Sequence, residues 1–167
     1  NEQRFLAEVG AVLTSSLDYE ETLTNVAQLA VRDLADFCIV DVVEEGGQVR
    51  RLKALSRDPS KAWICDLFMQ VPSFLGHHDP VSSVLEKGQT VLSPFVVPDG
   101  FASFTEEYLR AFRAADLKSL IGVPLLARGK PLGVITFISS SRFCEFGPAD
   151  ARLAEELAQR AALSIQN

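Results

Sequence analysis

Cysteine, histidine and long apolar runs are all scarce in this sequence of 167 residues. The 3 cysteines, Cys38, Cys65 and Cys144, are far apart and form no Cys-x-x-Cys pair. This spacing excludes a zinc knuckle and a disulfide scaffold and fits a reducing cytosol, so we expect small buried thiols. No apolar run approaches the roughly 18 residues of a membrane span, and Asn-Glu-Gln-Arg at the start is not a signal peptide. We therefore expect a cytoplasmic chain without direct membrane insertion.

An excess of positive charge is also missing. The formal net charge is −6, whereas duplex binding depends on clustered Lys and Arg that neutralise phosphates, so nucleic acid is not an expected partner. What is present is the composition of a soluble globular domain, with 47% hydrophobic and 23% charged residues. We expect one domain over residues 1–167. The chain begins and ends within helical patterns and lacks an initiator Met, so it reads as a segment of a longer protein.

The first third of the chain predicts two helices and then a β-hairpin. Apolar residues at helical spacing predict the first helix over residues 3–17. Asp18 and Glu21 form a capping-box pattern at the start of a second helix, which continues to Ala35. A strand over residues 37–43 and a more polar return strand over residues 48–56 follow, and the polar strand is expected nearer the edge of the sheet.

The middle of the chain, residues 72–117, has a short and broken pattern. After a helix that ends at Met69, it predicts a small helix from Pro80, a brief strand at residues 90–92 and a helix over residues 105–115. Six of the 11 Phe residues lie between residues 68 and 112. This segment is too apolar for a disordered linker, so we expect it to pack against the rest of the domain.

The last third contains the most regular pattern. Residues 119–138 are two Val-, Ile- and Leu-rich runs joined by Arg128-Gly129-Lys130, which predicts a buried β-hairpin. Gly122 and Gly133 are expected to leave room on one of its faces. Pro148 then begins a final amphipathic helix.

Four short motifs follow one another in this last third. A Val-Pro-Leu strand at residues 123–125, a turn at Gly129, a Leu-Gly-Val strand at residues 132–134 and a helix with Phe146 and Asp150 follow one another. With the preceding helices and hairpin, they resemble a GAF domain along essentially the whole chain. Residues 15–43 are more narrowly similar to GAF modules of multi-domain bacterial sensors, in which PAS and GAF modules precede a histidine kinase or a metal-dependent serine/threonine phosphatase.

The resemblance implies an α+β fold with an antiparallel sheet of five to six strands in the order 2-1-5-4-3. Terminal helices would cover one face, and the variable middle would form a pocket on the other. It divides the chain into an N-terminal signalling helix (1–17), a core (18–146) and a C-terminal helix (147–167) that leads to the next module. The implied function is non-catalytic sensing in a bacterial signal-transduction protein, with a two-component histidine kinase as the leading parent. A phosphatase regulator and a ligand-free dimerisation module are the alternatives.

Two kinds of site are expected. An aromatic cavity between the sheet and the middle segment would take an unidentified small molecule, and its expected lining is Phe68, Leu75, Phe101, Tyr108, Phe112 and Ser119. The first and last helices have apolar surface beyond what one sheet face can cover, so we expect them to pair in a parallel homodimer through Phe5, Val9, Val12, Leu153, Leu157 and Ala161. Adjacent PAS or GAF modules and an output domain of the parent chain are the other expected partners.

Haem, bilin and cyclic nucleotides bind to some members of the family, but this sequence supports none of them. Haem-holding members have a His just before the Val-Pro-Leu strand, and residues 111–119 contain none. Cys65 is followed by Asp66 rather than by the His found in one bilin-binding branch, and the Asn-Lys-x-Phe-Asp-Glu string of cyclic-nucleotide binders is absent. His77 and His78 with Asp79 could contribute metal ligands, but no further ligand has suitable spacing, so a solvated loop is preferred.

Two other features leave alternatives open. A few small GAF proteins reduce free methionine sulfoxide with a thiolate and a resolving cysteine, and only Cys65 is expected to face the cavity, so this enzyme is the least favoured alternative. Asp41 interrupts the apolar strand over residues 37–43, and a buried carboxylate needs a partner. It could hold a ligand, but the preferred interpretation is a solvated edge or a cross-strand pair with Arg51 or Lys53.

Overall fold

One antiparallel sheet organises the molecule. The computed structural model describes residues 2–15, 19–70, 80–94, 110, 113, 115–140 and 145–166. In this part of the chain, five strands lie in the order β2-β1-β5-β4-β3. The strands are β1 (Phe37–Val43), β2 (Val49–Ser56), β3 (Val91–Pro94), β4 (Leu117–Ala127) and β5 (Lys130–Ser140). The expected α+β fold and strand order are therefore confirmed.

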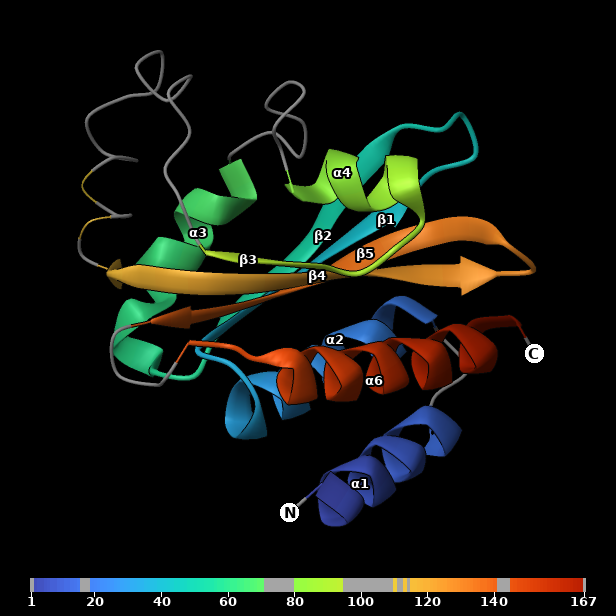
Figure 1. Ribbon diagram of the computed structural model, residues 1–167, viewed down its shortest axis with the longest axis horizontal. Helices are drawn as coiled ribbons and strands as arrows, with labels where there is room; N and C mark the ends of the chain where they lie inside the picture. The colour runs from blue at the N-terminus through green and yellow to red at the C-terminus, as the bar shows by residue number, and fades with distance from the viewer. Residues whose placement is uncertain are drawn as a thin grey trace.

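Helices cover both faces of the sheet (Figure 1). One face, here called the inner face, carries α2 (Tyr19–Asp33) and α6 (Pro148–Gln166), and α1 (Glu2–Ser15) lies against both of these helices. The opposite or outer face carries α3 (Ala62–Gln70), which follows the short helix η1 (Pro59–Lys61), and α4 (Pro80–Lys87). The helix predicted over residues 105–115 lies almost wholly outside the described residues. None of the helices in the described ranges is both long and apolar enough to cross a membrane.

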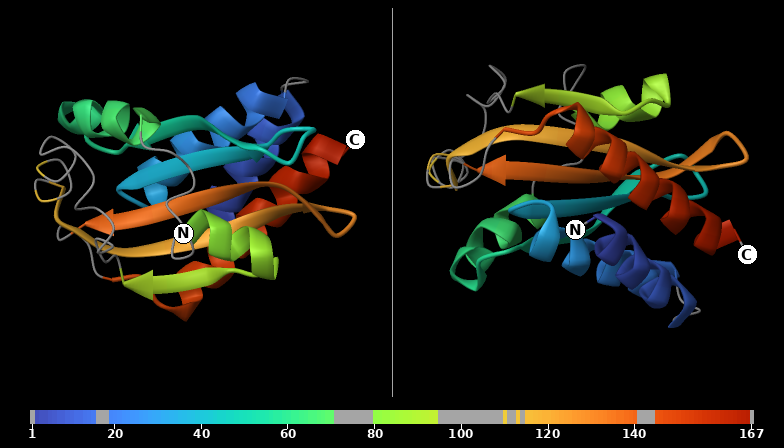
Figure 2. Two further views of the ribbon diagram at one scale, coloured as in Figure 1. Left: turned by 90° about the horizontal axis from the view of Figure 1, so that it is seen from above. Right: turned by 60° about the horizontal axis from the view of Figure 1, so that its bottom comes forward.

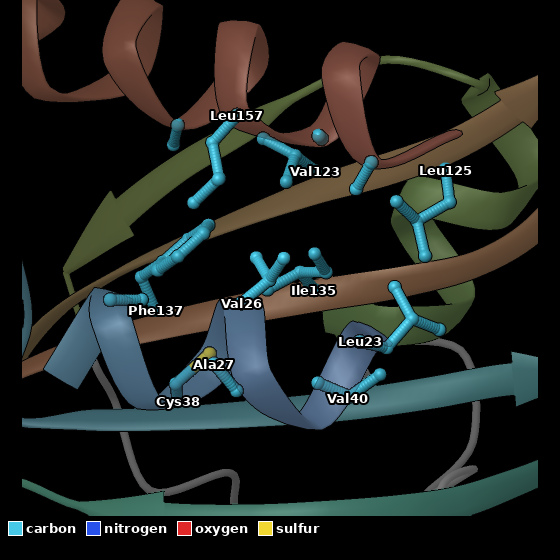
Figure 3. Close-up of a cluster of buried hydrophobic side chains, with 14 of the residues drawn as sticks. Leu23, Val26, Ala27, Cys38, Val40, Val123, Leu125, Ile135, Phe137 and Leu157 are labelled. Carbon is cyan, nitrogen blue, oxygen red and sulfur yellow. The ribbon is translucent and has the colours of Figure 1, made fainter. Parts of the chain in front are cut away.

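The main core lies between the inner face and its helices (Figure 3). It takes Leu23 and Val26 from α2, Leu157 from α6 and the inward residues of β1, β4 and β5. On β1, inward residues such as Cys38 alternate with outward residues such as Ile39, which belong to separate apolar clusters. Because both faces of β1 are covered, its sequence is apolar almost throughout. The more polar β2 forms one edge, as predicted.

The central hairpin is longer than predicted. Its strands, β4 and β5, extend from residue 117 to residue 140 and are joined at Arg128 and Gly129, with φ angles of 54° and 81°. Two successive residues with positive φ form the type I′ turn that matches the twist of a two-residue hairpin, and Gly at the second position adopts it without strain. This turn fixes the pairing of Ala127 with Lys130.

The outer helices lie over different parts of the sheet (Figure 2). Helix α3 packs on β2, whereas α4 packs on β3, β4 and β5. The described helices therefore contact the two sides of the outer face, with the middle of β1 and β5 between them.

Candidate functional site

Polar side chains lie in the middle of the outer face, between two apolar clusters. The cluster under α3 includes Ile39, and the cluster under α4 includes Val134. In the ladder between β1 and β5, Thr136 is opposite Ile39 and Asp41 is opposite Val134. Because side chains alternate along a strand, Asp41 and Thr136 point to the outer face where the two clusters meet.

Asp41 is fully buried and paired with a cation. Its Oδ1 lies 2.9 Å from Nε of Arg51 on β2. Nη1 of Arg51 also donates a hydrogen bond to the backbone oxygen of Phe68, 3.0 Å away, near the end of α3. A register shift between Val40 and Asp41 brings the two charged residues opposite each other. The predicted cross-strand pair with Arg51 is confirmed, and the solvated edge is wrong.

Two hydroxyl groups on the outer side are buried and have no hydrogen-bond partner within the described part of the chain. They belong to Thr136 on β5, which is 6% exposed, and Ser82 on α4, which is 8% exposed. A buried hydroxyl without a partner destabilises a fold by about 1–3 kcal/mol. Such groups therefore call for a ligand or an ordered water that supplies the missing bond. Sequence reasoning missed both residues, although Thr136 interrupts an apolar run.

The expected cavity lining is described only in part. Phe68 does lie on the outer face, where its ring packs edge-to-face on Phe37 with 6.0 Å between centroids and 79° between planes. Leu75, Phe101, Tyr108 and Phe112 lie outside the described residues. Their role as a cavity lining stays a prediction.

Ser119 lies on the inner face, so it does not line the outer face as expected. Its Oγ accepts a hydrogen bond from the backbone N–H of Phe146, 3.0 Å away, just before α6. The cause is a β-bulge, because Leu117 pairs with Ser140 and Ser119 pairs with the adjacent Ser139. A shift of one residue moves the following side chains to the opposite face of a strand.

Most of the residues predicted to form a dimer are buried by contacts within their own chain. Phe5, Val9, Leu157 and Ala161 are buried in the inner core, and Leu153 is half-buried. The side chain of Val12 lies outside the described part. These residues stabilise the packing of α1 and α6 in one chain, so a dimer through the terminal helices would use exposed neighbours instead.

Gly122 and Gly133 are tightly packed and do not leave the expected room. A Cβ atom at Gly122 would lie 2.9 Å from Cγ2 of Val84, because α4 packs directly above it. A Cβ atom at Gly133 would lie 2.3 Å from the backbone oxygen of Asp41. These glycines bring α4 and β1 close to the central hairpin.

The two described thiols are buried on opposite faces of the sheet. Cys38 belongs to the inner core and Cys65 to the cluster under α3. Burial raises the pKa of both thiols, so neither is a ready thiolate at neutral pH. His77, His78, Asp79 and Cys144 lie outside the described residues. Within the described ranges, no group of three His, Cys, Asp or Glu side chains could hold a metal ion.

A cleft of about 650 Å³ lies on the helical side, between α1, the end of α2 and the start of α6. Arg32 of α2 forms ion pairs there with Glu8 of α1 and with Asp33. Hydrogen bonding to Arg32 lowers the pKa of the Asp33 carboxyl. The exposed pair between Arg32 and Glu8 connects α1 to α2, and each exposed pair contributes little to stability.

The order of strands, the helical layer formed by both chain ends and the helices on the outer face define an α+β domain. A family model for the GAF domain matches residues 16–166, and the chain belongs to this family. No curated protein matches the chain.

Solved structures share the fold at low sequence identity. The GAF domain of a phosphoenolpyruvate-protein phosphotransferase from Coxiella burnetii has a TM-score of 0.74 and 16% identity, covering 99% of this chain and 93% of that one. A free methionine-R-sulfoxide reductase from Neisseria meningitidis, in complex with its substrate, has a TM-score of 0.69 and 17% identity, covering 99% and 88%. A domain of a two-component sensor histidine kinase protein, described as putative, from Sinorhizobium meliloti 1021 has a TM-score of 0.56 and 16% identity, covering 90% and 92%.

Proposed function

We propose that this GAF domain is a non-catalytic, cytoplasmic sensory module that binds a small molecule on its outer face. The observation that carries the proposal is that two hydroxyl groups there, those of Thr136 and Ser82, are buried and have no hydrogen-bond partner among the described residues. A buried hydroxyl without a partner lowers stability, and groups that lower stability without a structural benefit are typical of functional sites. A ligand that hydrogen-bonds to them would remove this penalty.

The ligand would act by favouring one of two states of the domain. It can shift the equilibrium only if its affinity for the two states differs. Arg51 connects the buried Asp41 on β1 to the end of α3, so a ligand that repositions α3 would also act on the central strands. The terminal helices α1 and α6 would then carry the change to neighbouring modules.

For the parent chain we propose a bacterial histidine kinase, with a regulator of a metal-dependent serine/threonine phosphatase as the alternative. The similarity of residues 15–43 to bacterial sensor modules supports this choice. The residues that follow Asn167 in the parent distinguish the two: a helix with a phosphoacceptor His indicates the kinase, and a metal-binding phosphatase domain indicates the alternative.

A methionine sulfoxide reductase is not favoured, because its chemistry needs two thiols at one cavity. Cys38 and Cys65 are separated by the sheet, and burial raises the pKa of each thiol. This arrangement supports a binding role over thiol catalysis by these two residues.

Native mass spectrometry of the purified domain tests the binding role. The wild type and the Thr136→Val/Ser82→Ala variant are incubated with haemin, biliverdin, cyclic GMP, methionine sulfoxide and a panel of hydroxylated metabolites. We expect the wild type to carry one small molecule, from the expression host or the panel, and the variant to lose it.

The matched control is Ser60→Ala, which removes an exposed hydroxyl that donates to Asp58 in its own turn and should leave binding unchanged. A wild type that carries nothing and takes up nothing, together with a closed outer face in a crystal structure, would support the ligand-free dimerisation module instead.

A further inference from the structure

Hydrogen bonds join the end of β5 to the segment that follows α2 and, through β4, to the segment that precedes α6. Ser139 and Ser140 are the last two residues of β5, and each is at most 2% exposed. The hydroxyl of Ser139 pairs with that of Ser119 on β4. The backbone N–H and the hydroxyl of Ser140 both donate to Oδ2 of Asp36, at 2.8 and 3.0 Å. We call Asp36, Ser119, Ser139 and Ser140 the serine clamp.

On one side, the clamp holds the junction between α2 and β1. Asp36 lies between these elements, and its backbone N–H donates to the oxygen of Ile138, 3.0 Å away. Its backbone oxygen accepts from the N–H of Arg57, at 2.8 Å. Hydrogen bonds to a carboxylate are stronger than neutral ones, and Asp36 is 8% exposed. The end of α2 therefore follows the position of β5.

On the other side, the clamp holds the start of α6. Ser119 Oγ accepts from Phe146 N–H, and the next residue, Gly147, donates its N–H to Oδ2 of Asp150 at 2.8 Å. The carbonyl of Gly147 in turn accepts from Ala151, 3.1 Å away, in the first turn of α6. The β-bulge in β4 makes this contact available, because it directs Ser119 inward.

Strand β5 also carries the outer-face group of the proposed site. Thr136 points outward three residues before Ser139. Of the two residues between them, Phe137 is buried in the inner core and Ile138 in the outer cluster under α3. We expect the hydrogen-bonded end of this strand to move as a unit, with its buried polar contacts either formed or broken rather than gradually stretched.

We propose that the serine clamp transmits a change at the outer face to the two helices by separate contacts, through Asp36–Ser140 to α2 and through Ser139–Ser119 to α6. This inference deepens the proposed sensory function and rests on it for its biological role. The clamp makes α6 responsive to the site although α6 lies on the opposite face of the sheet.

Amide hydrogen exchange measured by mass spectrometry tests the clamp without any ligand. Thr136→Val serves as the perturbation at the outer face, and peptides over residues 28–37 and 145–153 report on α2 and α6. In the wild-type background we expect this substitution to change exchange by about fivefold at both reporters, the lower end of typical coupling between sites.

Adding Ser139→Ala should abolish the change at residues 145–153 and leave that at residues 28–37. Adding Asp36→Asn should do the reverse, and Ser140→Ala replaces it if the Asn variant does not fold. Ser60→Ala is the control and should preserve both changes.

The proposal would be overturned if the exchange changes persist at both reporters in both clamp variants. It would also be overturned if Thr136→Val changes exchange at neither reporter in the wild-type background. The outcome is independent of ligand binding. If the domain shows the exchange pattern but binds no small molecule, the clamp proposal stands and the proposed function fails. If it binds a small molecule but lacks the exchange pattern, the proposed function stands and the clamp proposal fails.

Discussion

Thr136 and Ser139 are three residues apart on β5 and have opposite surroundings. Both are more than nine-tenths buried. The hydroxyl of Thr136 points outward and has no partner in the described part of the chain, whereas that of Ser139 points inward and pairs with Ser119. An unmade buried hydrogen bond is unfavourable and a made one is modestly favourable. Loss of a hydroxyl should therefore have opposite effects at the two positions.

Thr136→Val should raise the free energy of unfolding by about 1 kcal/mol, because Val keeps the branched shape and removes the unpartnered group. Ser139→Ala should lower it by about 1 kcal/mol. Urea unfolding followed by circular dichroism measures both, with Ser60→Ala expected within about 0.5 kcal/mol of the wild type. A Thr136→Val domain that is less stable than the wild type would mean that this hydroxyl is hydrogen-bonded in the free protein, and the proposed site would lose its main support.

At the scale of elements, β5 and β1 approach closely at Gly133. Gly133 lies opposite Val42, and a Cβ atom there would contact the backbone of Asp41 rather than a movable side chain. Gly10 in α1 differs in this respect, because a Cβ atom there would meet nothing within 4 Å. Close packing therefore requires glycine at position 133, whereas no contact requires it at position 10.

Gly133→Ala should lower the free energy of unfolding by about 3 kcal/mol, because backbone atoms of β1 must move to admit the methyl group. Gly10→Ala should raise it by about 0.5–1 kcal/mol, because Ala favours the helix and no contact opposes it. Thermal and urea unfolding of the two variants compare them directly. A Gly133→Ala domain as stable as the wild type would contradict the close packing of β1 on β5.

At the scale of the whole molecule, the two chain ends form one helical side. Helices α1 and α6 run in the same direction, and the N- and C-termini lie toward opposite ends of this side (Figure 1). Phe5 and Val9 pack α1 against the core, whereas Leu163 near the end of α6 is 59% exposed. An assembly through these helices would bury Leu163 and neighbouring exposed residues, and the buried side chains would keep their place within each chain.

The parallel dimer predicted from the sequence can be measured by size-exclusion chromatography with light scattering. We expect a particle of twice the 18.3 kDa chain mass. Leu163→Glu should shift it toward the monomer, because it places charge in the apolar contact. The control is Leu126→Glu on β4, which is also an exposed leucine and should not change the mass. A strict monomer at high protein concentration would contradict the dimer.

The order of helices and strands followed from the sequence because periodicity is a local property. Apolar spacing predicted α1, α2, β1, β2 and α6 close to their observed bounds, and the family pattern around the central hairpin implied the strand order. The same patterns indicated which positions are buried. They contain no information on which partner a buried polar group meets.

The tertiary structure decides which partner each buried polar group meets. A bulge in the pairing of β1 with β2 places Arg51 opposite Asp41, and a bulge in the pairing of β4 with β5 directs Ser119 to the inner face. The register between strands depends on residues far apart in the chain. The burial of Thr136 and Ser82 depends in the same way on the elements packed around them. The elements and the family were thus determined by the sequence alone. The polar site and the serine clamp exist only once the register of the sheet is set, because a shift of one residue reverses the face to which each side chain points.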